Sequence, residues 1–227
     1  MSSFSPVSAR LASLWQLLEG RLKRDDPSHD PAHVLRVYTW SLKLCAEAGA
    51  EPELAGAAAL LHDLIITPKD GPERSDAATL SAEASVPSLQ LVGFNEAEQQ
   101  RVLEAIATAS WSAGKPPRNA EGMVLQDADR LDAIGAIGIA RCFACGASMH
   151  SRAWMQGEQR EGGMWHPVDP WAQSGRSADD RRWALDHFER KLLRLPEGMH
   201  TTSARQEAQR RLATMQNFLA ALRAELV

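Results

Sequence analysis

The chain has 227 residues, of which 44% are hydrophobic and 24% are charged, a composition typical of a soluble globular protein. Its formal net charge is −4 and it contains no basic run, which argues against a binding surface for long nucleic acids. No stretch of about 18 consecutive apolar residues occurs either, so we expect neither a membrane-spanning helix nor a membrane partner.

Apolar residues recur at helical spacing from the start of the chain, and no segment shows the period of two that a half-buried strand requires. The sequence therefore predicts an all-α fold in a single domain without internal repeats. The first amphipathic helix is expected over about 7–23. Asp30 and Pro31 predict the start of the second helix, because aspartate is a good N-cap and proline fits the first helical turn. Gly49 predicts its end.

The third predicted helix begins at Pro52 and continues until Pro68, where the polar loop 67–75 begins. Further helices are expected at about 76–86, 96–110 and 119–145, followed by a long irregular segment near residues 146–177 and by C-terminal helices at about 178–194 and 201–226. The irregular segment is rich in Gly, Pro and Trp, which is typical of a lid or of a contact between subunits. A homodimer is therefore left open.

Three cysteines, Cys45, Cys142 and Cys145, cannot all pair with one another. We expect them to be reduced, which predicts a cytoplasmic protein because the N-terminus also lacks the pattern of a signal peptide. Cys142 and Cys145 form a C-x-x-C pair, but no second pair accompanies it and no strand precedes it. We interpret both as small packing residues.

Histidines and acids interrupt these apolar helices. His62 and Asp63 follow the apolar run AALL, and burial of an acid beside an imidazole is costly unless something compensates for it. His33 lies on the preceding predicted helix, while Asp129 and Asp132 are three residues apart and can share one face of a later helix. Each of these residues alone is more often a hydrogen-bonded structural residue. Together, two imidazoles and two carboxylates suit a divalent ion such as Mn²⁺, Fe²⁺, Co²⁺ or Ni²⁺.

The order His33, His62–Asp63, Asp129 resembles the HD superfamily of metal-dependent phosphohydrolases. The segments SHDPAHVLRVYTW, AALLHDL, LQDADRLDAIGAIGIARCF and LDHFERKLLRLPEGMHT are more narrowly similar to bacterial HD proteins characterised as nucleotide pyrophosphohydrolases. This resemblance covers nearly the whole chain, from about residue 25 to residue 226.

The resemblance implies a helical bundle with its HD core at about 25–145, preceded by the N-terminal helix and followed by the C-terminal helices at about 178–226. It also implies that His33, His62, Asp63 and Asp129 bind a divalent ion (Mn, Co, Ni, Fe or Mg). The choice of Asp129 among the acids of its helix follows the family pattern ADRL, because periodicity alone does not distinguish it from Asp127 or Asp132.

The implied reaction is hydrolysis of a nucleoside triphosphate to the monophosphate and pyrophosphate. A metal ion polarises a phosphoryl oxygen and lowers the pKa of a bound water, which supplies a nucleophile at neutral pH. Lys69 and Arg74 follow the His-Asp pair in a polar loop, where they either hold phosphate oxygens or are simply solvated. We predict Asp63, Lys69 and Arg74 as catalytic residues. His29, Lys69 and Arg74 are predicted to bind the small nucleotide substrate.

Ala109 departs from the pattern of the relatives, which often carry a histidine before the Ser-aromatic-Ser segment. This departure leaves open a second hypothesis, a nucleotide-binding HD protein with little or no turnover. It also argues against a two-metal site and against a di-iron oxygenase, both of which need additional imidazoles. A nucleotide phosphomonoesterase is a further alternative, which would release orthophosphate instead of pyrophosphate.

Overall fold

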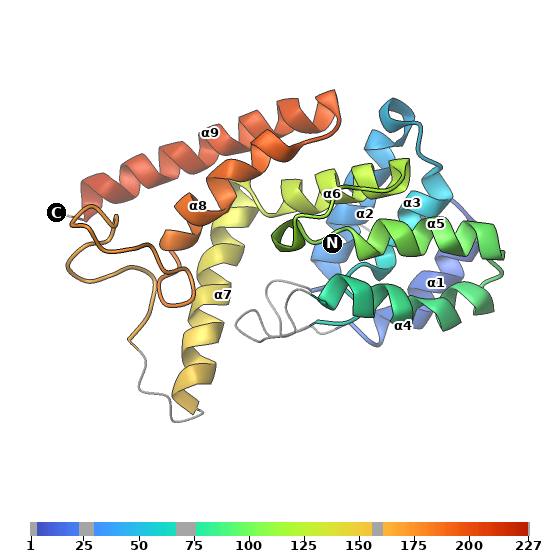
Figure 1. Cartoon of the computed structure of the whole chain (residues 1–227), viewed down its shortest axis with the longest axis horizontal. Coiled ribbons are helices and arrows are strands. Elements are labelled where there is room, and N and C mark those ends of the chain that lie inside the picture. The colour runs from blue at the N-terminus through green and yellow to red at the C-terminus, as the bar shows by residue number, and fades with distance from the viewer. Residues whose placement is uncertain (1–3, 23–29, 67–75, 156–160, 227) are drawn as a thin grey trace. The chain divides into compact units, whose positions relative to one another are not determined.

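The computed structural model describes residues 4–22, 30–66, 76–155 and 161–226, with the backbone alone for 151–155. The chain forms two compact units. Within the described residues, the first unit comprises 4–22, 30–130 and 200–204, and the second comprises the remainder from residue 131 onward. Both units consist of helices (Figure 1), and the described residues contain no strand beyond one bridge between Gly163 and Trp183. The predicted all-α class is confirmed, and the single-domain assignment stays a prediction.

The helices of the first unit begin and end largely where capping residues predict. They are α1 (Ala9–Glu19), α2 (Pro31–Ala48), α3 (Pro52–Leu61), α4 (Ala77–Leu91), α5 (Glu96–Ala107), the 3₁₀ turn η2 (Trp111–Ala113) and most of α6 (Ala120–Asp132). Asp30 caps α2, because its side chain accepts a hydrogen bond from the backbone N–H of His33 at 2.7 Å. Gly49 ends α2 with φ at 68°, a conformation that favours glycine.

The third helix is shorter than predicted. It ends at Leu61 instead of continuing to Pro68, and His62 is its C-cap. The backbone N–H of Ile65 donates to the side-chain hydroxyl of Ser81 on α4 at 3.1 Å, so it does not extend the helix. The helix therefore stops directly before His62 and Asp63. The predicted loop 67–75 lies outside the described residues.

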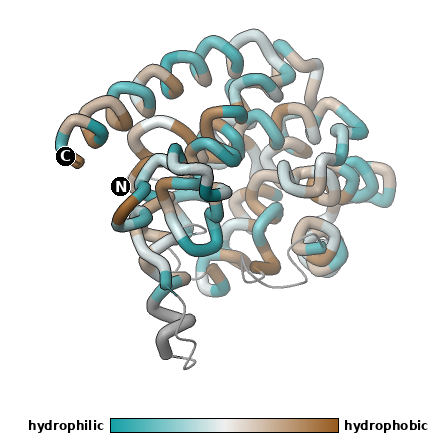
Figure 2. The backbone as a smooth tube through the Cα atoms, turned by 60° about the vertical axis from the view of Figure 1, so that its left-hand side comes forward, coloured by the Kyte–Doolittle hydropathy of each residue, from teal (hydrophilic) through white to brown (hydrophobic). Residues whose placement is uncertain are grey.

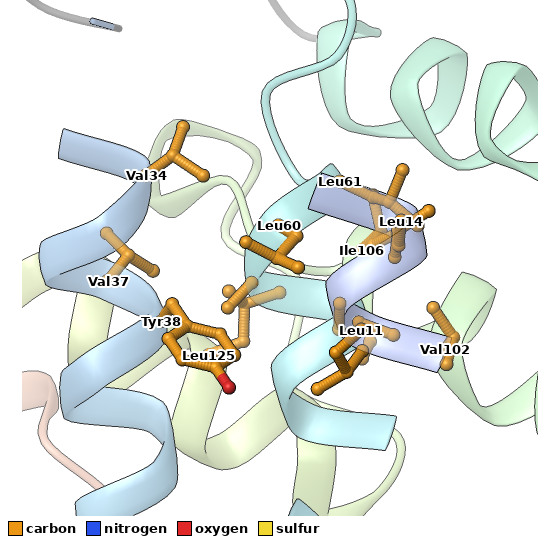
Figure 3. Close-up of a cluster of buried hydrophobic side chains, with 14 of the residues drawn as sticks. Leu11, Leu14, Val34, Val37, Tyr38, Leu60, Leu61, Val102, Ile106 and Leu125 are labelled. Atoms are coloured by element: carbon orange, nitrogen blue, oxygen red, sulfur yellow. The ribbon is translucent and has the colours of Figure 1, made fainter. Parts of the chain in front are cut away.

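Helix α3 is the centre of the first unit. Every residue from Leu54 to Leu61 is buried, and the helix contacts α1, α2, α4 and α5. Gly56 permits this close packing, because a Cβ there would lie 2.7 Å from Leu11 Cδ1 and 2.9 Å from Tyr38 Cε2. Figure 3 shows these two side chains among the buried residues of the core. The C-terminal end of α3 is thus held within the core.

Arg10 connects α1 to two other helices of this unit. Its guanidinium donates to Glu53 of α3 and to Glu98 of α5, and it lies 4.1 Å from the centre of the Phe94 ring. We expect Arg10→Ala to lower the free energy of unfolding by about 1–2 kcal/mol, because it removes charge-assisted hydrogen bonds and a cation–π contact. Urea denaturation measures this change. Arg21→Ala, at an exposed arginine, should change the free energy of unfolding by less than about 0.5 kcal/mol. If Arg21→Ala lost as much stability as Arg10→Ala, the contacts of Arg10 would not be the cause.

The second unit contains α7 (Gly135–Met155), α8 (Asp186–Arg190), the 3₁₀ segment η3 (Leu192–Gly198) and all but the first residues of α9 (Thr202–Glu225). Its core includes three phenylalanine rings, Phe143, Phe188 and Phe218, whose centroids lie 5.8–6.2 Å apart. Hydrophilic and hydrophobic residues alternate along most helices (Figure 2), as expected for helices that bury one face.

The prediction of one helix over 119–145 is wrong, because the chain breaks between α6 and α7. Gly135 adopts φ of 78°, which a helix cannot continue through. A Cβ on Gly138 would lie 2.2 Å from the carbonyl oxygen of Ala133, so only glycine allows the chain to pass so closely. The irregular segment also begins later than predicted, since α7 continues to Met155.

The predicted helix 178–194 is mostly absent, and α8 covers only Asp186–Arg190 of it. The buried carboxylate of Asp186 accepts two hydrogen bonds from the Arg176 guanidinium, at 2.6 and 2.8 Å, and one from the backbone N–H of Asp179 at 2.7 Å. These bonds hold the preceding residues in turns.

Among the described helices, no single helix is long and apolar enough to cross a membrane. Two successive helical segments, Ala120–Asp132 and Gly135–His150, reach the required length and apolar character only when they are taken together.

Candidate metal centre

Two histidines meet in the first unit, one from the start of α2 and one from the end of α3. The Nε2 atoms of His33 and His62 are 3.3 Å apart. Both residues are nearly inaccessible to solvent, with exposed fractions of 1% and 4%. The N-cap at Asp30 fixes the first turn of α2, and the buried packing of α3 fixes its last turn, so each ring is held at the end of a fixed helix.

Two carboxylates lie beside these rings. Asp63 Oδ2 is 3.3 Å from His33 Nε2 and 3.2 Å from His62 Nε2, and Asp129 Oδ1, from α6, is 3.7 Å from His33 Nε2. The side chains of Asp63 and Asp129 are 25% and 33% exposed, in contrast to the buried rings. The cluster is therefore closed by imidazoles on its inner side and accessible to solvent at its carboxylates.

The distances within this cluster fit a single divalent ion. Ligands at about 2.1 Å from one ion are about 3.0 Å apart at right angles and about 3.4 Å apart in a tetrahedron. His33, His62 and Asp129 each offer one ligand atom, and these three atoms lie within 4.8 Å of one another. Asp63 is not part of that set of three, but its oxygen lies within ligand spacing of both rings. Mixed nitrogen and oxygen ligands suit Mn²⁺, Fe²⁺, Co²⁺ or Ni²⁺.

The backbone of α3 sets the tautomer of His62. Its Nδ1 atom lies 2.9 Å from the carbonyl oxygen of Ala59, an acceptor, so Nδ1 carries a proton in that contact. In the neutral ring the lone pair is then on Nε2, the atom that faces His33 and Asp63. Such a bond from the outer nitrogen is the usual support of a metal-binding histidine.

A proton competes with a metal ion at this histidine. Burial disfavours protonation of His62, but the charge and hydrogen bond of Asp63 and the charge of Asp129 outweigh it, which raises the pKa of His62 to about 9. An ion must displace this proton. We therefore expect the affinity for Mn²⁺ to increase by up to about tenfold per pH unit as the pH rises towards 9.

Isothermal titration calorimetry at about pH 6, 7 and 8 measures this dependence. Repetition in buffers of different ionisation enthalpy counts the protons released on binding. Binding that releases no proton and does not change with pH would contradict the expected competition.

The structure places the other two aspartates of α6 with different partners. Asp127 is fully buried and accepts hydrogen bonds from His200 and Thr201, and Asp132 pairs with Arg141 at 2.6 Å. Ala109, which departs from the family pattern, is buried. The three predicted substrate-binding residues, His29, Lys69 and Arg74, lie outside the described residues, so their roles stay predictions.

The sequence did not indicate that His200 and Thr201 lie against α6 in the first unit. Thr201 is the first residue of the predicted helix 201–226, where a threonine can act as the N-cap, and its hydroxyl does accept from the backbone N–H of Ala204 at 3.2 Å. Nothing in that signal indicates Asp127 as its partner, more than 70 residues earlier.

Comparison with known proteins places these residues in a family context. The model of the HD domain matches residues 32–134, a range that contains both histidines and both carboxylates of the cluster. The uncharacterized protein YpgQ of Bacillus subtilis is 31% identical over 210 residues, covering 90% of this chain and 88% of YpgQ.

Solved structures resemble this chain over nearly its whole length. YpgQ in complex with ADP has a TM-score of 0.66 at 28% identity, over 95% of this chain and 97% of that chain. A Lactobacillus plantarum protein has a TM-score of 0.69 at 28% identity, over 97% and 98% of the two chains. An HD-superfamily hydrolase from Bacillus thuringiensis has a TM-score of 0.61 at 29% identity, over 95% and 94%.

Proposed function

Since the chain belongs to the HD superfamily of hydrolases, we propose that it is a metal-dependent phosphohydrolase that converts nucleoside triphosphates to monophosphates and pyrophosphate. One observation carries the proposal: His33, His62, Asp63 and Asp129, from three parts of the chain, converge at ligand spacing. The cluster has more acids than cations among these four side chains, so an anionic substrate needs a bound cation to approach it.

A divalent ion at these ligands would polarise a phosphoryl oxygen and acidify a coordinated water. The buried rings of His33 and His62 exclude solvent from the inner side of the site, and a substrate would approach the ion from the side of the partly exposed carboxylates of Asp63 and Asp129. We propose Mn²⁺ as the first ion to test, because imidazole and carboxylate ligands together suit it.

The substrate class is supported by the relative YpgQ, which has been crystallised with ADP. A nucleoside diphosphate retains the phosphoanhydride bond and the base of the proposed substrates. In this proposal Lys69 and Arg74 hold phosphate oxygens after the His-Asp pair, and His29 contacts the nucleotide. In this proposal Asp63 has two roles, as a ligand of the metal ion and as a catalytic residue.

The proposal is tested by assaying the purified protein, stripped of metal and then supplied with Mn²⁺, Co²⁺, Ni²⁺ or Mg²⁺, against a panel of nucleoside triphosphates and monophosphates. We expect monophosphate and pyrophosphate in equal amounts. Release of orthophosphate from mononucleotides would indicate a phosphomonoesterase. Tight binding of the triphosphate without products would indicate the nucleotide-binding protein that Ala109 leaves open. Either result would overturn the proposed reaction.

A further inference from the structure

Asp127 holds the start of α9 against α6. Its carboxylate is fully buried and accepts three hydrogen bonds, each at 2.8 Å, from the backbone N–H of His200, the backbone N–H of Thr201 and the hydroxyl of Thr201. The Thr201 hydroxyl also accepts from the backbone N–H of Ala204, which makes Thr201 the N-cap of α9. A buried carboxylate needs such partners, so these bonds are a strong attachment.

The side chain of His200 makes a second set of contacts with α6. Its Nε2 atom lies 2.9 Å from Gln126 Oε1 and 3.2 Å from Arg130 Nη1. Arg130 Nη2 donates to Gln126 Oε1 at 2.6 Å. The amide nitrogen of Gln126 donates to the backbone carbonyls of Thr108 and Lys115, so the amide oxygen is directed towards His200 and Arg130.

These contacts flank Asp129. Gln126, Asp127 and Arg130 precede and follow it within about one helical turn, and none of the contacts that bind His200 and Thr201 uses the Asp129 carboxylate itself. We name the five residues Gln126, Asp127, Arg130, His200 and Thr201 the α6 clamp. The clamp therefore holds the turn of α6 that contains Asp129. The Asp129 carboxylate itself lies beside His33.

We propose that the α6 clamp positions Asp129, so that His200 and Thr201 set the affinity of the metal centre without contacting the ion. This inference rests on the proposed metal site. The clamp matters most for Asp129, because its side chain is 33% exposed, whereas the two histidines are buried and held by packing. Ligand distances tolerate deviations of only about 0.2 Å, so a small shift of the α6 turn is sufficient to weaken binding.

The clamp joins residues more than 70 positions apart in the sequence. The sequence of α6 alone does not predict this link to residues 200 and 201. Outer partners of metal ligands typically contribute about 10–100-fold in metal affinity. His200 and Thr201 are therefore positioning residues in this proposal, and they act through the backbone of α6.

The test measures Mn²⁺ binding to the metal-free full chain by calorimetry, which does not depend on turnover. Thr201→Val keeps the size and charge of the side chain and removes the hydroxyl, and we expect it to weaken Mn²⁺ binding by about tenfold. Thr201→Ser keeps the hydroxyl and should bind Mn²⁺ like the wild type. Asp127→Asn should weaken binding by up to about 100-fold.

Glu47→Gln is the matched control. The Glu47 carboxylate, from α2, also holds the start of α9, because it accepts from the backbone N–H groups of Thr202 and Ser203, and neither of these bonds involves a residue of α6. We expect Glu47→Gln to lower the melting temperature less than Thr201→Val, because Glu47 is exposed and glutamine retains one acceptor oxygen. Only Thr201→Val should weaken Mn²⁺ binding.

The outcomes separate two conclusions. A folded Thr201→Val that binds Mn²⁺ as tightly as the wild type, or a Glu47→Gln that loses as much affinity, would overturn the role of the clamp. If the wild type itself binds no divalent ion, the proposed metal centre fails first. Circular dichroism verifies that each variant is folded. If Asp127→Asn does not fold, the comparison of Thr201→Val with Thr201→Ser still tests the role of the clamp.

Discussion

Replacement of His62 by alanine is expected to abolish binding of the divalent ion and to lower kcat/KM for nucleoside triphosphates by at least about 100-fold. His62 Nε2 lies 3.3 Å from His33 Nε2 and 3.2 Å from Asp63 Oδ2, so its removal takes away one of the four proposed ligands. Loss of an outer partner of a ligand already reduces affinity by about 10–100-fold, and loss of a ligand should have a larger effect. Steady-state kinetics and calorimetric titration with Mn²⁺ measure the two quantities.

His150→Ala is the control for this variant. His150 is an exposed histidine on α7, in the second unit, and its replacement should leave metal binding and turnover unchanged. His62→Gln retains a side chain of similar reach and polarity, which limits the cavity that alanine would leave at a buried site. If both His62 variants remain folded and hydrolyse nucleotides at the wild-type rate, the proposed centre is not the catalytic site.

The second large effect concerns stability. We expect Gly138→Ala to lower the free energy of unfolding by about 3 kcal/mol, because the new Cβ would lie 2.2 Å from the carbonyl oxygen of Ala133 and 2.6 Å from its carbonyl carbon. These are backbone atoms, so they cannot rotate away as a flexible side chain would. The break between α6 and α7 must open to accommodate the methyl group. Equilibrium unfolding in urea, followed by circular dichroism, measures the loss.

Gly20→Ala tests whether this loss is specific to the close approach. A Cβ on Gly20 would meet no atom within 4 Å, and Gly20 has φ of −76°, which any residue adopts. We expect its stability to change by less than about 1 kcal/mol. Equal losses in the two variants would show that the contact with Ala133 is not the cause.

Local signals in the sequence predicted the elements that depend on local interactions. Asp30 and Gly49 predicted the bounds of α2, because a cap acts within one turn. The predictions failed where distant or backbone contacts decide. The break at Gly135 requires a positive φ that an apolar, helix-like pattern does not reveal. Residues 178–185 lack a helix because Asp186 is bound to Arg176 and Asp179.

The candidate site shows the same division. The spacing of His33, His62 and Asp63 on apolar helices suggested a shared site from the sequence alone. The choice of Asp129 depended on family resemblance, since Asp127 and Asp132 lie on the same helix. Each of these three acids has a partner from another part of the chain: Thr201 for Asp127, His33 for Asp129 and Arg141 for Asp132. Only the folded chain distinguishes them.

The membership of residues 200–204 in the first unit has a consequence for synthesis of the protein. A ribosome releases the chain from its N-terminus, so residues 131–199 must emerge before the last part of the first unit becomes available. Until then Asp127 lacks the two backbone amide groups, of His200 and Thr201, that hold it in the finished protein. The unit that carries His33 and His62 can therefore complete its folding only at a late stage of translation.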